Sequence, residues 1–266
     1  MPDADLAGRR LHYVRRGSGA PLLLNMGMSG SHLHWGDPFL EQLERTFDVI
    51  AYDNRGIGAS APLAEGETFT IADLAGDALG LLDHLGVPNA HVLGISMGGM
   101  VAQELALRAP DRVRTLTIGC SYCGGPGSLL APEATMTKLA QGMFSGNADV
   151  ALRAAFECNV SPGFQTDEHF AAFRAVGLRS PAPVPVVMTQ LQAISAFDVS
   201  ARLPGLDRPT LVLHGDLDEM LPYPNGELIA GLIPGARLER LDGLGHMFWW
   251  EDPLRAAALI SEHAGG

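Results

Sequence analysis

The chain has 266 residues, which is long enough for one large α/β domain or two small ones with a sizeable buried core. Hydrophobic residues make up 47% of it and charged residues 18%, a composition that excludes an intrinsically disordered chain. The formal net charge of −12 argues against nucleic acid as a partner, because a negative surface repels phosphate backbones.

The cysteines and the first residues bear on the cellular compartment. Three cysteines do not build a disulfide framework, and residues 1–10 carry acids where a secretory signal has basic and then apolar residues. No segment approaches the roughly 18 consecutive apolar residues that a membrane-spanning helix needs. We therefore expect a cytoplasmic protein with no membrane partner.

Short apolar runs bounded by turn residues alternate with longer segments of helical period. This alternation predicts an α/β fold in which helices flank a mostly parallel sheet. The predicted strands are 22–25, 49–53, 91–95, 113–119, 210–214 and 236–241. The predicted helices are 71–85, 97–108 and 253–263.

The alternation stops between residues 123 and 203. This stretch contains helical segments at 136–144, 150–156 and 168–176, and a proline-rich loop at 179–185. Because the chain then returns to a strand, we predict a helical cap, 123–203, inserted into a core domain of residues 1–122 and 204–266. A second independent domain is the alternative.

A glycine-flanked serine follows the predicted strand 91–95. Ser96 lies between Gly94 and Gly98 where the next helix begins, which is the pattern of a nucleophile elbow. Such a sharp turn needs small flanking residues because the backbone is crowded there. The start of the helix also directs N–H groups toward a developing oxyanion. A glycine-rich turn with an incidental serine is the alternative.

A nucleophilic serine needs a base and an orienting carboxylate, in the chain order serine, acid, histidine for this kind of turn. Asp218 follows the predicted strand 210–214, and His246 lies in a glycine-rich loop after the strand 236–241. Functional loops of such sheets lie beyond the strand ends. We predict the triad Ser96, Asp218 and His246, with Asp216 and Glu219 as competing acids.

The chain resembles the α/β-hydrolase superfamily over nearly all of its length except the cap. Residues 53–60, DNRGIGAS, resemble the D-x-R-G-x-G-x-S loop of that family, and residues 215–222 resemble its acid loop. Residues 22–28 occupy the place of its oxyanion strand, with Met26 where a histidine is usual. The resemblance implies an α/β-hydrolase fold.

The resemblance also implies an activity. Residues 96–103 and the small cap resemble 3-oxoadipate enol-lactonases and cofactor-free haloperoxidase-like esterases, and residues 232–246 are similar to anthracycline methylesterases. These imply a serine hydrolase that cleaves a carboxylic ester or lactone of a small to medium, largely apolar molecule. The backbone N–H groups of Met28 and Met97 would form the oxyanion hole, and no cofactor or metal is required.

Other functions stay open. The same acyl-enzyme could react with peroxide as a perhydrolase or haloperoxidase, and the fold also serves small-molecule receptors with little turnover. A carbon–carbon bond hydrolase is disfavoured, because residues 26–31 do not match the usual Gly-Ser-Gly-Pro-Gly oxyanion loop. Dehalogenases and epoxide hydrolases need a carboxylate where Ser96 stands. Whether the chain forms a homo-oligomer is also open.

Several side chains are candidates for contacting substrate, with packing in the core or cap as the alternative for each. They are His32, Trp35, Met143, Phe144, Phe197 and Met247. Three cap arginines could instead hold a substrate carboxylate: Arg153, Arg174 and Arg179. Cys120 and Cys123 are predicted to be ordinary thiols, because a zinc site needs more ligands than one pair. His214 is predicted to be a core or supporting residue.

Overall fold

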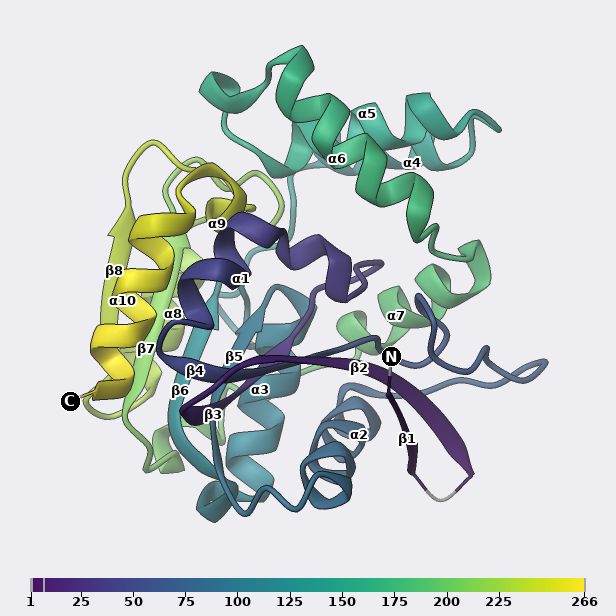
Figure 1. Cartoon of the computed structure of the whole chain (residues 1–266). Coiled ribbons are helices and arrows are strands. Elements are labelled where there is room, and N and C mark those ends of the chain that lie inside the picture. Colours follow the sequence, from purple (N-terminus) through teal and green to yellow (C-terminus); the bar gives the residue numbers. More distant parts are fainter. Residues whose placement is uncertain (1, 7, 266) are drawn as a thin grey trace.

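An eight-stranded sheet runs through the molecule in a computed structural model that describes residues 2–6 and 8–265 (Figure 1). The strand order is β1-β2-β4-β3-β5-β6-β7-β8; β1 and β2 are antiparallel to their neighbours, and the pairs from β4 through β8 are parallel. The strands are β1 (Asp3–Leu6), β2 (Arg9–Gly17), β3 (Ala20–Asn25), β4 (Phe47–Tyr52), β5 (Ala90–Ile95), β6 (Val113–Gly119), β7 (Thr210–Gly215) and β8 (Arg237–Leu241).

The six predicted strands are all present, each within two residues of its predicted ends. The two strands that the sequence did not reveal are β1 and β2 at the edge of the sheet. Strand β2 carries four arginines, so its apolar side chains do not form a continuous run. An edge strand half exposed to solvent tolerates such charge, whereas the buried central strands do not.

Helices cover both faces of the sheet (Figure 1). Two buried apolar clusters, one on each face, contain alternating residues of the same strands: Leu23 belongs to one, and Leu22 and Leu24 belong to the other. The flanking helices are α1 (Asp37–Leu43), α2 (Ile71–His84), α3 (Met97–Arg108), α8 (Pro224–Leu232), α9 (Phe248–Glu251) and α10 (Pro253–Gly265). The predicted α/β architecture is confirmed.

Four helices lie between β6 and β7, where the sequence predicts a cap. They are α4 (Glu133–Met143), α5 (Ala148–Asn159), α6 (Asp167–Arg179) and α7 (Val184–Ser195). Helices α4, α5 and α6 lie together at one end of the molecule, whereas α7 lies closer to the sheet (Figure 1). The division into core and cap remains a prediction.

Helix α7 shortens the predicted loop 179–185. Residues 180–183 do join α6 to α7 as a loop, but the helix begins at Val184, with Pro183 as its N-cap and Pro185 within the first turn. Proline is well tolerated there, because the first N–H groups of a helix have no partner inside the helix. Helix α7 packs closely against the loop after β4. A Cβ at Gly56 in that loop would lie only 2.8 Å from Val186 Cγ2.

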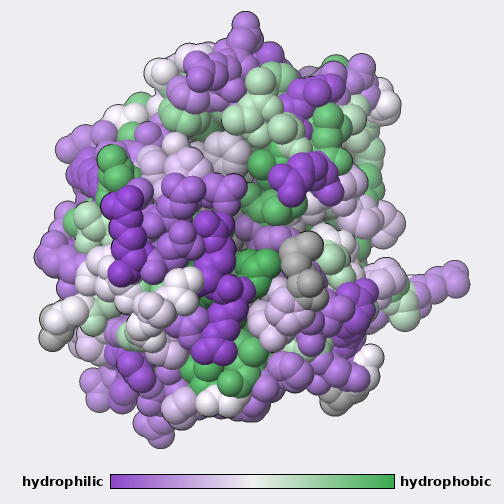
Figure 2. All heavy atoms as spheres, in the orientation of Figure 1, coloured by the Kyte–Doolittle hydropathy of each residue, from purple (hydrophilic) through white to green (hydrophobic). Residues whose placement is uncertain are grey.

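The face of the molecule drawn in Figure 2 is largely hydrophilic, with separate hydrophobic patches. The most exposed large apolar side chains are Phe144 at 68%, Leu254 at 64% and Leu130 at 63%. Within residues 2–6 and 8–265, no helix has the length and apolar character needed to cross a membrane.

Candidate active site

Ser96 sits on a tight turn between β5 and α3. Its backbone has φ 54° and ψ −124°, a conformation that residues other than glycine rarely adopt. The flanking glycines are needed for space: a Cβ at Gly94 would lie 2.0 Å from Gly98 O, and a Cβ at Gly98 would lie 1.9 Å from Asn25 O. This geometry has the form of the elbow expected from the sequence.

The parallel register brings the loops that carry the acid and the histidine to the same edge of the sheet as Ser96. Strand β6 pairs with β5 on one side and β7 on the other, and β8 pairs with β7, so the carboxyl ends of all four lie side by side. Asp218 follows β7 and His246 follows β8. His246 Nδ1 lies 2.7 Å from Asp218 Oδ2, and both side chains are buried.

Asp218 is held by more than His246. Its Oδ1 accepts hydrogen bonds from the backbone N–H groups of Met220 and Leu221, both at 2.8 Å. His214 Nε2 lies 3.2 Å from Asp218 Oδ2. Burial acts to raise the pKa of this carboxyl, but the charge of His246 and the hydrogen bonds from both histidines lower it to about 2. Asp218 is therefore ionised at neutral pH.

His214 has a closer relation to the site than its sequence position indicated. It is the penultimate residue of β7, four residues before Asp218, and its side chain is fully buried. The prediction of a supporting residue is consistent with its contact to Asp218. In the sequence, the only feature that links the two residues is their spacing of four positions. Side chains four positions apart are neighbours in a helix, but His214 lies in a strand, so the spacing did not predict this contact.

Cys120 lies beside the acid and the histidine. Its thiol, one Asp218 oxygen and one His246 nitrogen lie within 4.8 Å of one another, and its backbone φ is 39°. Burial, together with the charge of Asp218, raises the pKa of this thiol well above its usual value. Cys120 and Cys123 are both free and buried, as expected of ordinary thiols.

The loop after β3 runs next to Ser96. A Cβ at Gly27 would lie 3.2 Å from Ser96 Cβ. Ser29 N–H donates to Gln190 Oε1 of α7 at 2.9 Å, and Gly30 N–H donates to Gly27 O at 3.3 Å. The N–H groups of Ser29 and Gly30 are thus both engaged, one with α7 and one within the loop, and Met28 N–H remains the expected oxyanion donor.

The six residues predicted to contact substrate do not converge. Trp35 is fully buried and stacks on Phe39 with ring centroids 5.9 Å apart, so it packs in the core. Phe144 follows α4 as its C-cap residue and faces solvent. The prediction of a substrate contact therefore loses support for these two residues.

The other four candidates lie in different surroundings. His32 is bound to Asp53, and Met143 is half-buried on α4. The ring of Phe197 packs against that of Tyr122, and the N–H of buried Met247 donates to Asn159 O at 2.7 Å. Their contact with substrate stays a prediction.

Two hollows lie elsewhere on the molecule. One of about 470 Å³ is lined by residues that include Val14, His32 and Arg179. Another of about 560 Å³ lies among the cap helices and includes Lys138 and Phe170. Neither is lined by Ser96 or His246, so we do not assign either as the reaction site.

Comparison with known proteins adds to this geometry. A family model described as "alpha/beta hydrolase fold" matches residues 20–253. "Putative carbamate hydrolase RutD" from Azorhizobium caulinodans is 32% identical over 251 residues, which cover 93% of this chain and 92% of that protein.

Solved structures are similar over the whole chain. A hydrolase from Pseudomonas aeruginosa is 30% identical with a TM-score of 0.85, and the match covers 100% of this chain and 98% of that one. The enol-lactonase from Burkholderia xenovorans is 26% identical with a TM-score of 0.85, and the match covers 100% of both chains.

Proposed function

The chain belongs to the alpha/beta hydrolase fold family, as the sequence predicted, and we propose that it is a serine hydrolase of carboxylic esters or lactones. One observation carries the proposal. The buried His246–Asp218 pair, 2.7 Å apart, lies at the sheet edge where Ser96 occupies a strained elbow. An ionised carboxylate that receives the Nδ1–H of an imidazole leaves Nε2 free to act as a base.

The proposed reaction proceeds through an acyl-enzyme. Ser96 Oγ attacks the carbonyl carbon while His246 Nε2 takes its proton, and the N–H groups of Met28 and Met97 bind the oxyanion. His246 then gives the proton to the leaving oxygen, and the ester bond breaks. Water, deprotonated by His246, attacks the acyl-enzyme and releases the acid and Ser96.

The substrate class is proposed from the sequence resemblance and the character of the cap. We expect a small to medium, largely apolar ester or lactone, and the similarity to an enol-lactonase supports the lactone. The relative named as a carbamate hydrolase gives a second candidate class. A carbamate would react at the same carbonyl position and form a carbamoyl-enzyme on Ser96.

A fluorophosphonate probe tests the nucleophile directly. The wild-type chain should be labelled on the peptide that contains Ser96, and Ser96→Ala should not be labelled. Ser195→Ala is the matched control, because Ser195 is exposed at the end of α7 and bonds only locally, to Leu191 O. Absence of label from the folded wild type, or equal labelling of Ser96→Ala, would remove the proposed nucleophile.

A substrate panel then separates the classes. Aryl esters, lactones and carbamates of matched size should be compared by kcat/KM with the labelled enzyme. A preference for esters or lactones supports the first class, and a preference for carbamates replaces it with the second.

A further inference from the structure

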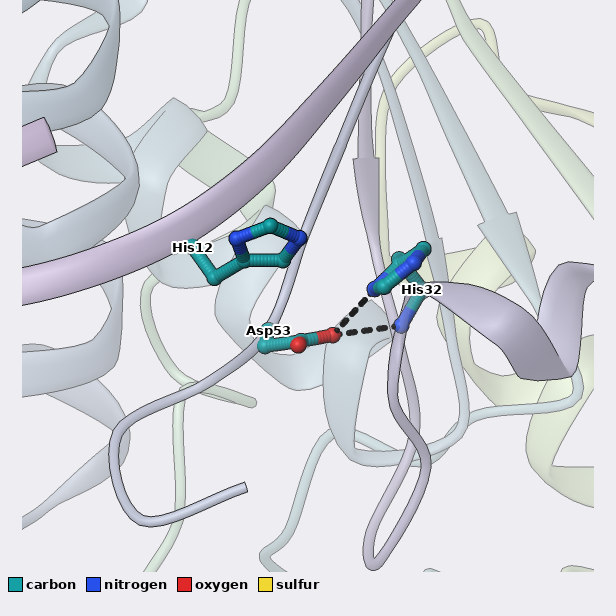
Figure 3. Close-up of side chains that lie close together, drawn as sticks. All are labelled: His12, His32 and Asp53. Carbon is teal, nitrogen blue, oxygen red and sulfur yellow. Dashed lines mark hydrogen bonds and ion pairs between the residues drawn. The ribbon is translucent and has the colours of Figure 1, made fainter. Parts of the chain in front are cut away.

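Two imidazoles and one carboxylate meet away from the proposed triad. His12 lies on β2, His32 begins the short helix η1 (His32–Trp35), and Asp53 directly follows β4. Each offers one ligand atom, and the three atoms lie within 4.8 Å of one another (Figure 3). The three segments are far apart in the sequence, so only the fold brings these side chains together.

His12 has a ring nitrogen without a partner. The residue is 3% exposed, and its Nδ1 lies 3.0 Å from Asp3 Oδ1. That contact leaves Nε2, which is buried and has no hydrogen-bond partner in the described part of the chain. The free nitrogen points toward His32 and Asp53 (Figure 3). A buried polar atom without a partner is costly, so its position calls for a ligand.

Asp53 supplies a buried negative charge. Its Oδ1 accepts the backbone N–H of His32 at 2.7 Å and lies 2.8 Å from His32 Nδ1, while Oδ2 accepts Ala59 N–H at 2.9 Å. The two oxygens of this buried carboxylate therefore face His32 on one side and the loop at Ala59 on the other, and Oδ1 is the atom placed to bind a cation.

We propose that His12, His32 and Asp53 bind one divalent transition-metal ion. The 2.8 Å between His32 Nδ1 and Asp53 Oδ1 corresponds to an angle of roughly 80–90° at an ion with bonds of about 2.1 Å. That angle fits two neighbouring positions of a facial arrangement of two histidines and one carboxylate. The ion would replace the hydrogen bond, and His32 would carry its proton on Nε2.

The chemistry of the three donor atoms indicates which metal ions the site would bind. Two imidazoles and one carboxylate suit zinc and other late first-row metals, whereas magnesium and calcium prefer oxygen ligands alone. Asp3 at His12 Nδ1 provides the carboxylate partner that commonly orients a metal-binding histidine. Neighbouring donors of an ion with bonds of about 2.1 Å lie about 3 Å apart, so side chains whose donor atoms are within 4.8 Å need to move by at most about 2 Å.

An ion could reach the proposed site from the side of His32. His32 lines the hollow of about 470 Å³, where water could complete the coordination. Three arginines line the same hollow. Two of them are already paired, Arg15 with Asp48 and Arg16 with Glu44. The third, Arg179, is exposed, so solvent screens its charge.

Zinc titration of the untagged, chelator-treated full chain tests the site. Calorimetry should show one zinc ion per chain, and His12→Gln and His32→Gln should each weaken binding about tenfold or more. His91→Gln is the matched control: His91 is also buried on a strand with Nδ1 bonded, to Thr115 Oγ1. Circular dichroism establishes that each variant is folded. Asp53→Asn is avoided, because Asp53 accepts backbone N–H groups that the fold needs.

Cys120, Asp218 and His246 also lie close enough together to hold a metal ion, so the experiment must show which of the two groups binds it. Cobalt bound at the proposed site should give visible bands of nitrogen and oxygen ligands without a thiolate charge-transfer band, and Cys120→Ser should bind it equally. Three outcomes would overturn the proposal: no binding by the folded wild type, affinity unchanged in both histidine variants, or a charge-transfer band lost in Cys120→Ser. None depends on hydrolytic activity.

Discussion

His214 Nε2 lies 3.2 Å from Asp218 Oδ2, the same oxygen that lies 2.7 Å from His246 Nδ1. His214 Nε2 is also 2.7 Å from Leu221 O. Both neighbours of this nitrogen are acceptors, so Nε2 carries the proton and donates to both. His214 therefore positions Asp218 through the same oxygen that contacts His246.

Replacing His214 by phenylalanine should lower kcat with little change in KM. The ring shape is kept, but Asp218 loses one charged hydrogen bond, which is worth about 1.5–3 kcal/mol and corresponds to about a 10- to 100-fold loss. Steady-state kinetics on a reactive ester measures both constants, and the urea midpoint shows whether the fold is retained. A rise in KM alone would show that His214 does not act through Asp218.

Ser96→Ala should abolish hydrolysis while the protein stays folded and binds ligand. Removal of a member of such a triad costs roughly four to six orders of magnitude in the chemical step. Turnover and far-UV circular dichroism are the measurements. Retention of more than about a tenth of the wild-type rate would contradict the assignment.

Asp218→Asn should lose far more activity than Asp216→Asn. Asp216 is engaged elsewhere: Arg240 Nη2 donates to it at 2.8 Å and Gly243 N–H at 2.7 Å. Asn at position 218 instead disturbs the tautomer of His246 and its stabilisation as an imidazolium. Both variants should be compared by kcat on one ester. The reverse ranking would make Asp216 the acid of the triad.

Asp218 should also stabilise the fold against acid. Its pKa of about 2 lies below the value of about 3.9 in an unfolded chain. The contribution is therefore complete above pH of about 4 and is lost as pH falls toward 2, with a size on the order of 2 kcal/mol. The free energy of unfolding from urea titrations across this range should fall more steeply in the wild type than in Asp218→Asn. Parallel slopes would refute this contribution.

Local patterns predicted the elements and the order of the proposed triad. Apolar runs located the central strands within two residues, and helix 97–108 has the bounds of α3. Strand β2 and helix α7 escaped this reasoning, because charge at a sheet edge and proline in a first turn mimic loops.

Contacts between distant segments could not be read from periodicity. Ser29 is hydrogen-bonded to Gln190, and His12 lies beside Asp53, although the members of each pair are far apart in the sequence. The sequence offered Trp35 as a pocket residue because it follows the segment that is expected to form the oxyanion hole. In the fold, Trp249 packs against it with ring centroids 5.9 Å apart, and it lies in the core.

The cap arginines bear on the charge of the substrate. Arg153 lies over the Phe170 ring, 3.5 Å from its centroid, and Arg174 is bonded to Asp149 at 2.6 Å. Both cations are therefore already engaged within the cap. Arg179 is exposed and lines the hollow beside His32, which does not include Ser96.

We therefore expect a preference for neutral substrates. For neutral esters of increasing acyl length, kcat/KM should rise by up to about fourfold per methylene, since each buried methylene contributes at most about 0.8 kcal/mol. An anionic lactone of similar size should be poorer, and Arg179→Gln should change neither result. The apolar cap residues can equally pack between cap and core, in which case the neutral series stays flat. A strong preference for the anion that is lost in Arg179→Gln would overturn the expectation and assign that arginine to a substrate carboxylate.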